Sequence, residues 1–338
     1  MAGKRTVLNR YRLRLRRKRL LWRAFRSRRD LTPVADRTAS VTQEQILLFS
    51  TVRNEMMRLP WFMKHYRALG VGHFIFVDND SDDGTAEWLA GQPDTSVWAT
   101  ASGYRAARFG MDWLTSLQRR FAPGHWTLTV DADELLIYPG HDNCPLPDFV
   151  KRLERFNQKA MGAIMLDLYP KGRPDEHTYL PEQNPLDVLP WFDAWGYQVQ
   201  RQARMGNLWL QGGPRARCFF ADDPARAPTL NKIPLVRWDR AFVYVNSTHN
   251  ALPAWLNETW KSHGGVAASG VLLHTKFLPG TAERAAQEKA RREHFQQPEA
   301  FDAYYDALIR GTDMWEPGSA RYTCWRQMVD LGLMSELR

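Results

Sequence analysis

The sequence has few cysteines and no long hydrophobic run. Its 338 residues include three cysteines, Cys144, Cys218 and Cys324, which are far apart and lack any metal-binding spacing. We therefore expect reduced thiols in a reducing compartment, without a function. No segment approaches the roughly 18 consecutive apolar residues of a membrane-spanning helix, and the N-terminus lacks the apolar core of a secretory signal. The folded body is expected to stay in the cytoplasm.

Two nucleotide-binding signatures are also missing. A dinucleotide-binding fold needs GxGxxG after its first strand, and a phosphate-binding loop needs GxxxxGK[ST]. The segment at the end of the first predicted strand reads STVRNE and matches neither pattern, and no internal repeat is apparent. What the chain does have is apolar material, because 44% of its residues are hydrophobic and 14 are tryptophans. This is enough for one large globular domain with extensions.

Positive charge is concentrated at the N-terminus. Residues 1–30 hold 13 Lys or Arg and one acid, a net of +12, while the other 33 bases and 36 acids leave −3. On a helix, apolar and basic residues would lie on different faces: Leu8, Tyr11, Leu15, Trp22 and Phe25 against Arg12, Arg16, Arg17, Arg19 and Arg23. This pattern favours binding to an anionic membrane surface. A disordered, solvated arm is the next alternative, and nucleic-acid binding is the least favoured.

Beyond a linker at residues 31–40, predicted strands and helices alternate. This is typical of an α/β fold with a mostly parallel sheet and helices on both faces. Ligands of such sheets bind where the strands end. Predicted strands cover Ile46–Val52, His73–Val77, Ser96–Thr100 and Trp126–Val130, and predicted helices cover Glu55–Leu69, Thr85–Leu89 and Tyr104–Arg120. Three further helices are predicted at Ala282–His294, Phe301–Ile309 and Tyr322–Leu331.

Acidic residues follow two of these strands. The tetrapeptide Asp131-Ala132-Asp133-Glu134 comes directly after an apolar run, and a second acidic loop occupies residues 78–83. Two carboxylates one residue apart on an extended backbone point the same way, so Asp131 and Asp133 can face one site. Oxygen ligands suit Mg²⁺ or Mn²⁺. Acidic residues at strand ends are also common turn formers and helix caps, but a second acidic loop favours a ligand site.

These segments resemble a known family. The motifs RNE, DNDSDDGT and DADE, in this order and spacing, are similar to the nucleotide-binding half of bacterial family-2-like GT-A glycosyltransferases. The resemblance runs from about Ile46 to Ser335. It implies a Rossmann-like GT-A domain at residues 41–338, with a nucleotide-binding half (41–140), an acceptor half (141–280) and C-terminal helices (281–338), preceded by the basic arm and linker (1–40).

The resemblance also implies residue roles. Nucleotide-sugar contacts fall on Arg53, Asn54, Glu55, Asp78, Asn79 and Asp131, metal ligands on Asp131, Asp133 and the late histidine His274, and acceptor contacts on Gly212, Gly213 and Arg215 of a GG loop. A divalent cation, Mn²⁺ or Mg²⁺, is the expected cofactor. It would lie between Asp133 and the donor diphosphate.

Further candidates come from the local pattern. Arg105 and Arg108 lie three apart on one predicted helix face and can both reach a diphosphate, although solvent-exposed arginines are the alternative. Trp191 and Trp195 suit a sugar-stacking wall, although aromatic clusters are more often core. Secondary candidates are His249, Lys232 and Lys276.

The sequence therefore predicts a metal-dependent glycosyltransferase. It moves a sugar from a nucleotide-diphosphate donor to a glycan or lipid-linked acceptor, at the inner face of a membrane and with an inverting course. Such a course needs a carboxylate base, for which Asp222 and Asp193 are the candidates. The alternatives are nucleotidyl transfer, which normally shows a Gly-rich basic loop after the first strand, and a membrane-associated protein that binds nucleotide sugar or glycan without turnover.

Overall fold

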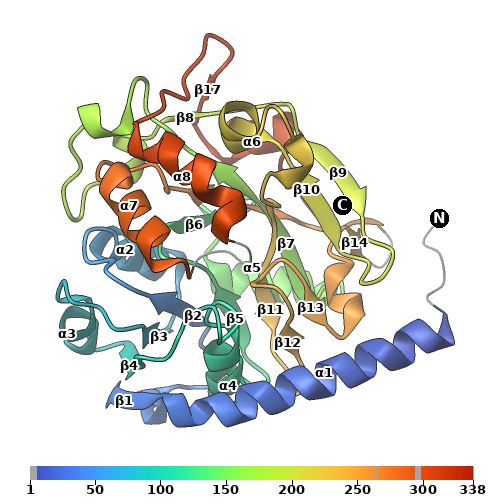
Figure 1. The fold of residues 1–338 in the computed structure, drawn as a ribbon. Coiled ribbons are helices and arrows are strands. Elements are labelled where there is room, and N and C mark those ends of the chain that lie inside the picture. The colour runs from blue at the N-terminus through green and yellow to red at the C-terminus, as the bar shows by residue number, and fades with distance from the viewer. Residues whose placement is uncertain (1–5, 263–264, 294–297, 338) are drawn as a thin grey trace.

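A computed structural model describes residues 6–262, 265–293 and 298–337 (Figure 1). Within these residues, a nine-stranded sheet forms the centre of the molecule. In spatial order its strands are β1 (Thr32–Ala35), β4 (Thr95–Ala99), β3 (His73–Asp78), β2 (Leu47–Val52), β5 (Trp126–Thr129), β11 (Asn231–Arg237), β7 (Ala160–Asp167), β16 (Gly270–His274) and β6 (Glu134–Ile137).

The first four strands of the alternating pattern are parallel, as predicted. β2 pairs in parallel with both β3 and β5, and β3 with β4, so their carboxyl ends meet at one edge of the sheet. β11 runs antiparallel to both of its neighbours, β5 and β7, and β6 runs antiparallel to β16. The fold is therefore the expected Rossmann-like α/β class, with a mostly parallel sheet that turns mixed in its second half.

Alternate strand residues pack on different helices, because successive side chains point to opposite faces of a sheet. Leu48, Phe74 and Phe76 belong to one buried cluster with the helices α2 (Leu59–Leu69) and α5 (Leu146–Arg155). Leu47 and Phe49 belong to a second cluster with α4 (Met111–Phe121). Helices thus cover both faces and leave the carboxyl edge of the parallel strands open to a ligand.

Several of the remaining helices and short strand pairs contribute residues to that edge. The helices are α3 (Thr85–Ala90), α6 (Gly213–Phe219), α7 (Thr281–Arg291), α8 (Asp302–Ile309) and α9 (Trp325–Asp330). The strand pairs are β8 (Trp191–Phe192) with β17 (Ala320–Arg321), β9 (Gln198–Arg201) with β10 (Leu208–Gln211), β12 (Val243–Tyr244) with β13 (Ala251–Leu252), and β14 (Lys261–Ser262) with β15 (Gly265–Val266). The elements that contribute residues to the edge are α6, α7, α8 and β10. The three predicted C-terminal helices correspond to α7, α8 and α9, although His294, the predicted end of the first, lies outside the described residues.

The basic N-terminal segment is helical, as expected, but it is not a free arm. α1 (Val7–Ser27) runs along α4 (Figure 1) and buries Leu13, Leu20 and Ala24. The Nε of Arg23 donates to Oδ2 of Asp112 on α4 at 3.0 Å. The linker that follows contains β1, which pairs antiparallel with β4 at the edge of the sheet. In the part of the chain that is described, no helix is both long and apolar enough to span a bilayer.

The helix predicted at Tyr104–Arg120 begins later than expected. Arg108 (φ 54°), Phe109 (φ 58°) and Gly110 (φ 75°) are all left-handed, and α4 starts only at Met111. Three consecutive left-handed residues cannot continue a right-handed helix. A Cβ on Gly110 would also lie 2.5 Å from the Oγ1 of Thr51, so glycine is needed at this close contact with the end of β2.

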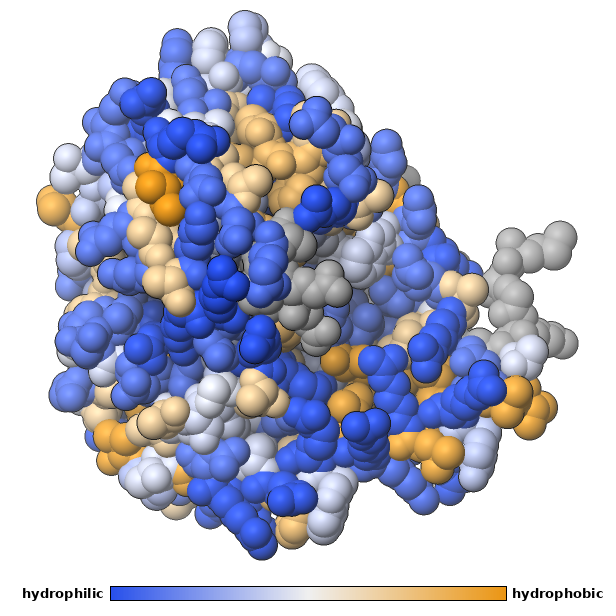
Figure 2. Space-filling view, viewed as in Figure 1, coloured by the Kyte–Doolittle hydropathy of each residue, from blue (hydrophilic) through white to orange (hydrophobic). Residues whose placement is uncertain are grey.

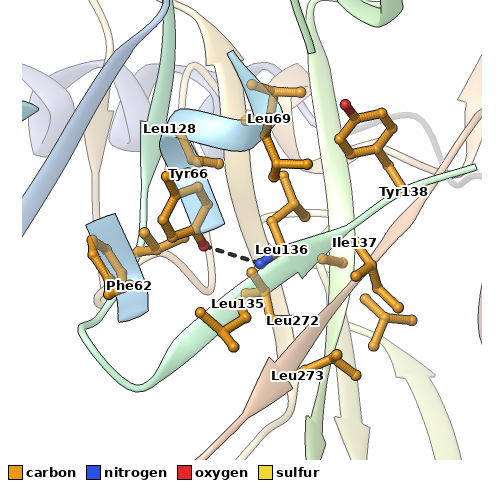
Figure 3. Packing of buried hydrophobic residues seen from close by; sticks show 14 of the residues in the cluster. Phe62, Tyr66, Leu69, Leu128, Leu135, Leu136, Ile137, Tyr138, Leu272 and Leu273 are labelled. Atoms are coloured by element: carbon orange, nitrogen blue, oxygen red, sulfur yellow. Dashed lines mark hydrogen bonds between the residues drawn. The ribbon is translucent and has the colours of Figure 1, made fainter. Parts of the chain in front are cut away.

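One buried tyrosine fixes the start of β6 against α2. The Tyr66 hydroxyl donates to the carbonyl of Glu134 at 2.8 Å. It also accepts from the amide of Leu136 at 3.0 Å (Figure 3). The ring is fully buried and packs edge-on against Phe62. Because these two backbone groups belong to the strand that follows Asp133, Tyr66 helps to place the acidic turn.

We expect Tyr66→Phe to lower the free energy of unfolding by about 1–3 kcal/mol, because two buried backbone groups lose their hydrogen-bond partner. Urea denaturation measures this change. Tyr138→Phe is the matched control, since its equally buried ring makes a single hydroxyl bond, to the carbonyl of Cys144 at 2.7 Å. An equal or larger loss in Tyr138→Phe would contradict the role given to Tyr66.

Candidate functional site

A cleft with two lobes opens at the carboxyl edge of the parallel strands. The first, which we call the cationic lobe, is a cavity of about 620 Å³ between the 53–58 loop and α7. The second, the strand-edge lobe, is about 650 Å³ and lies over the ends of β2, β3 and β5. Both are lined by Arg53, Glu55, Asp133 and Lys276, so they are continuous and meet at Asp133.

A hydrogen-bonded series of four ionisable groups lies where the lobes meet. The imidazole of His274 places Nε2 3.1 Å from Oδ2 of Asp133 and Nδ1 2.6 Å from Oδ1 of Asp167. Asp167 in turn accepts from the Nε of Arg215 at 2.7 Å. Strand register produces this arrangement, because His274 is paired with Asp167 on one side and with Glu134 on the other. Asp133 is the member that faces both lobes.

The neighbouring charges decide how these buried groups titrate. Burial by itself raises the pKa of Asp133, but His274, Arg58 and Lys276 outweigh it and hold that pKa well below its usual value. Burial lowers the pKa of His274, but the carboxylates of Asp133 and Asp167 outweigh it and the net pKa is raised. The junction of the lobes thus carries an ionised carboxylate that faces the cleft.

The donor set at the junction fits a divalent cation. Within the described residues, no cluster of three or more His, Cys, Asp or Glu side chains is arranged to hold a metal ion. Asp133 and His274 nevertheless offer two ligand atoms 3.1 Å apart, close to the roughly 3 Å between adjacent ligands of an octahedral Mg²⁺ site. Such ions usually take one or two protein ligands plus substrate phosphates and water. Asp167 on the other imidazole nitrogen completes the pattern expected around a metal-binding histidine.

Asp131 has a different partner. The buried ammonium of Lys232 lies 2.9 Å from Oδ2 of Asp131 and 2.9 Å from Oε1 of Glu134. Burial lowers the pKa of Lys232, but the two carboxylates outweigh this effect and the net pKa is raised, so the side chain keeps its charge. The Asp131 side chain is 45% exposed to the strand-edge lobe, whereas Glu134 is buried. Asp131 therefore faces ligand space and pairs with Lys232, whereas His274 pairs with Asp133.

The cationic lobe has more positive than negative side chains. Five cations line it, Arg53, Arg58, Lys276, Arg284 and Arg291, against the four acids Glu55, Asp82, Asp133 and Glu288. Arg58 forms an ion pair with Glu55 at 2.5 Å. In the part of the chain described, Arg284 donates only to oxygens of Leu278, Pro279 and Thr281. Burial, followed by the nearby Arg58, lowers the pKa of Arg284 to about 9, as expected of a guanidinium without an acidic partner.

The loops after β2 and β3 are interlocked. Arg53 donates to the carbonyl of Asn79 at 2.6 Å, and Asn54 to Asp82 at 2.7 Å. Asn79 accepts from Arg291 of α7 at 2.8 Å, which connects α7 to the end of β3. Arg53, Asn54, Glu55 and Asn79 therefore lie on the cleft, as the resemblance implies.

Asp78 is placed differently. Its side chain is buried and accepts from the amide and hydroxyl of Ser81, at 3.1 and 2.5 Å, and it lines neither lobe. The carboxylate stabilises the turn after β3, so the structure gives it no direct contact with ligand space.

The arginines predicted on the helix face point elsewhere. Arg105 is exposed, and Arg108 pairs with Asp112 at 2.6 Å. Neither lines a lobe, because the left-handed residues before α4 replace the helix on which both were expected to lie. The aromatic residues of this loop, Tyr104 and Phe109, line the strand-edge lobe in their place.

Several acceptor-side candidates also lie outside the cleft lining. Trp191 packs edge-on against Trp315, and Trp195 is 67% exposed. Gly212 (φ 141°) serves a close backbone contact, since a Cβ there would lie 2.5 Å from the carbonyl of Gly196, and Gly213 follows at the start of α6. Arg215 alone of the GG-loop residues lines the strand-edge lobe.

Neither candidate base reaches the cleft. Asp193 is paired with Arg217 at 2.9 Å and accepts from the Tyr169 hydroxyl, and it lines neither lobe. Asp222 is exposed in the loop after α6 and also lies outside the lining. His249 does line the strand-edge lobe, where burial, followed by the nearby Lys232, lowers its pKa to about 3 and keeps the imidazole neutral.

One further site residue, Asp167, has a recognisable signal in the sequence. Asp167 ends the apolar run of β7, the same pattern that drew attention to Asp131. Arg58 and Arg284 gave no such signal, since isolated arginines near helix starts are common on protein surfaces. Arg284 reaches the cleft because α7 folds back over the sheet edge (Figure 1), and Arg58 lines it from the start of α2.

Comparison with known proteins gives weak likenesses. No family model matches the sequence, and no curated protein matches it. Among solved structures, the mannosyltransferase PcManGT from Pyrobaculum calidifontis, in complex with GDP-Man and Mn²⁺, is 17% identical at a TM-score of 0.24, over 49% of this chain and 47% of that one. The chain thus spans about half the length of this mannosyltransferase.

A second solved structure is similar over more of the chain. It is a putative glucose-1-phosphate thymidylyltransferase from Bacillus anthracis in complex with a sucrose, 10% identical at a TM-score of 0.28, over 79% of this chain and 83% of that one. Both neighbours are named as transferases. At such TM-scores neither likeness bears on function, which has to be argued from the site itself.

We expect Asp167→Asn to weaken Mn²⁺ binding by about 10–100-fold, because the imidazole of His274 loses the carboxylate that orients it. Titration of Mn²⁺ into the protein by calorimetry measures this directly, without any activity assay. Asp193→Asn is the matched control, since it also removes a buried, arginine-paired carboxylate, but outside the cleft. Equal Mn²⁺ affinity in wild type and Asp167→Asn would contradict the arrangement described here.

Proposed function

We propose that the protein is a divalent-cation-dependent glycosyltransferase that uses a nucleotide-diphosphate sugar. The observation that carries the proposal is the Asp133–His274 pair at the junction of a cleft whose neighbouring lobe is lined by five Lys and Arg side chains. The carboxylate and the imidazole suit a divalent metal ion, and the Lys and Arg side chains suit a diphosphate bound to that ion.

The diphosphate belongs at the junction and in the cationic lobe. Lys276 and Arg284 face that space, and Arg284 forms its described bonds only to neutral oxygens. A buried guanidinium in this state gains from an anionic ligand, because a charge-assisted bond replaces part of its lost hydration. Arg291, held by Asn79, offers a further cation from the same helix.

The nucleoside and the acceptor share the strand-edge lobe. Tyr104 and Phe109 supply aromatic surface for a base, while Asp131 supplies an acceptor for ribose hydroxyls. Trp209 and the 225–229 loop come from the second half of the chain and form the opposite wall, where a glycan or lipid-linked acceptor fits the proposal.

The chemistry follows from these positions. Asp133 and His274 would hold the divalent cation, which would supply electrostatic stabilisation of the departing diphosphate. Lys276 and Arg284 stabilise the same developing charge from the cationic lobe. An inverting course needs a carboxylate that faces the acceptor, and Glu55 and Asp131 are cleft-lining carboxylates, in contrast to Asp193 and Asp222. Burial raises the pKa of Glu55 above its usual value in spite of Arg58, which favours proton uptake.

The proposal also includes the location expected from the sequence, which is the cytoplasmic face of a membrane, as in bacterial polysaccharide or lipid-linked glycan assembly. Nucleotidyl transfer is the second candidate, because that chemistry also uses paired carboxylates on a related fold. It is disfavoured because STVRNE, at the end of β2, lacks the Gly-rich basic loop of nucleotidyltransferases.

We expect Arg284→Met to weaken UDP binding in the presence of Mn²⁺ by about tenfold or more, because one charge-assisted contact to the diphosphate is lost. Isothermal titration with UDP, and with GDP in parallel, measures the change. Arg237→Met is the matched control, since Arg237 pairs with Glu154 on the surface, outside both lobes.

Asp133→Ala should abolish the Mn²⁺ dependence of UDP binding. If UDP affinity is unchanged in Arg284→Met and in Asp133→Ala, and does not depend on Mn²⁺, the proposed diphosphate site is contradicted.

A panel of nucleotide-diphosphate sugars, incubated with the protein and Mn²⁺, should yield free nucleoside diphosphate from at least one donor. Slow transfer to water in place of the acceptor is the expected cause, and Asp133→Ala should remove it. The discriminating measurement is the product. Release of pyrophosphate from a nucleoside triphosphate and a sugar 1-phosphate, with no hydrolysis of any donor, would replace glycosyl transfer by nucleotidyl transfer.

A further inference from the structure

The outward face of α1 is apolar, although it faces solvent. Val7 is 84% exposed, Trp22 59%, Tyr11 58%, and Leu8, Leu15 and Phe25 between 40% and 56%. At 3.6 residues per turn these six positions fall within an arc of about 100°. The buried residues Leu13, Leu20 and Ala24 lie on the opposite side of the helix. α1 therefore packs on the protein with a narrow inner face and presents a wider apolar stripe outward.

Rows of arginine flank this stripe. Arg12 and Arg19 lie along one side and Arg10 and Arg14 along the other, and all four are exposed. α1 contains no acidic residue. Figure 2 shows the resulting surface, in which apolar patches alternate with polar side chains along the lower right of the molecule. Leucine and aromatic rings bordered on both sides by guanidinium groups match a bilayer surface with anionic headgroups.

We propose that the outward face of α1 docks the protein on an anionic lipid bilayer. The helix lies in the plane of the interface, with the apolar stripe inserted at the headgroup boundary and the flanking arginines among the phosphates. α1 is held rigidly on the body, because Arg23 binds both Asp112 and the carbonyl of Ala106, and Arg119 binds the carbonyl of Leu21. Docking therefore fixes the orientation of the whole molecule on the membrane.

Charge argues against the other occupants of this surface. A second copy of the chain would bring two stripes together with their arginine rows, and the like charges would repel. Nucleic acid would use the arginines but would leave the leucines and Val7 without apolar cover, since phosphate backbones offer none. The bilayer is the partner that uses both parts of the face.

Vesicle sedimentation of the full chain tests this proposal without donor, acceptor or cation, so that its failure is separate from failure of the proposed activity. We expect binding to vesicles that contain phosphatidylglycerol, weak binding to phosphatidylcholine alone, and weakening by added salt. Trp22→Ser with Phe25→Ser should lower the partition coefficient roughly tenfold or more, because the inserted apolar area is lost. Arg12→Glu with Arg19→Glu should remove the preference for the anionic lipid.

The control removes exposed apolar residues from another surface. Phe156 is 38% exposed and Leu180 62%, and both lie outside α1. Phe156→Ser with Leu180→Ser should bind vesicles as the wild type does. Urea unfolding of each variant confirms that it is folded. The proposal is overturned if both serine pairs reduce vesicle binding equally. It is also overturned if the wild type does not bind anionic vesicles but binds single-stranded RNA, with an affinity that Trp22→Ser with Phe25→Ser leaves unchanged.

Discussion

A hydrogen-bonded series of ionisable side chains runs through the middle of the cleft, and both the fold and the site depend on it. Asp133, His274, Asp167 and Arg215 form this continuous series across β7, β16, α6 and the turn before β6. The inner members, His274 and Asp167, each have a partner on both sides, which offsets the large cost of removing such groups from water. Loss of one member would leave its neighbour buried with one partner fewer. The series also leaves its outermost carboxylate facing the cleft, where a ligand can reach it.

The two lobes divide the chemistry between parts of the chain that are distant in sequence. The strand-edge lobe lies over the ends of parallel strands, as expected for this class of sheet, and loops from the second half of the chain line the rest of it. The cationic lobe depends on α7, which returns from the C-terminal region and contacts the end of β3 through Arg291 and Asn79. The proposed recognition of the phosphates thus depends on a segment outside the βαβ pattern, and this helix lines one side of the cleft.

The sequence predicted the parallel strands, their order of appearance and the loops at their ends, because hydrophobic runs and turn residues are local signals. It did not reveal Lys232 as the main partner of Asp131. β11 runs backwards relative to its neighbours, so it brings its first residues to the edge where other strands bring their last. Strand direction is decided by long-range pairing and is absent from local patterns. Arg108 was misplaced for a related reason, since its left-handed backbone follows from packing around Gly110.

The seating of α1 on α4 affects how the N-terminal region can be studied. Asp112 is shared by Arg23 of α1 and Arg108 of the loop that carries Tyr104 and Phe109. A protein shortened to begin after α1 would lose the Arg23 contact to Asp112 and would expose the apolar surface beneath Leu13 and Leu20. Reduced turnover or aggregation of such a truncated protein would report damage to a wall of the cleft. Deletion therefore cannot separate the proposed anchoring from the proposed catalysis, whereas point substitutions on the outward side can.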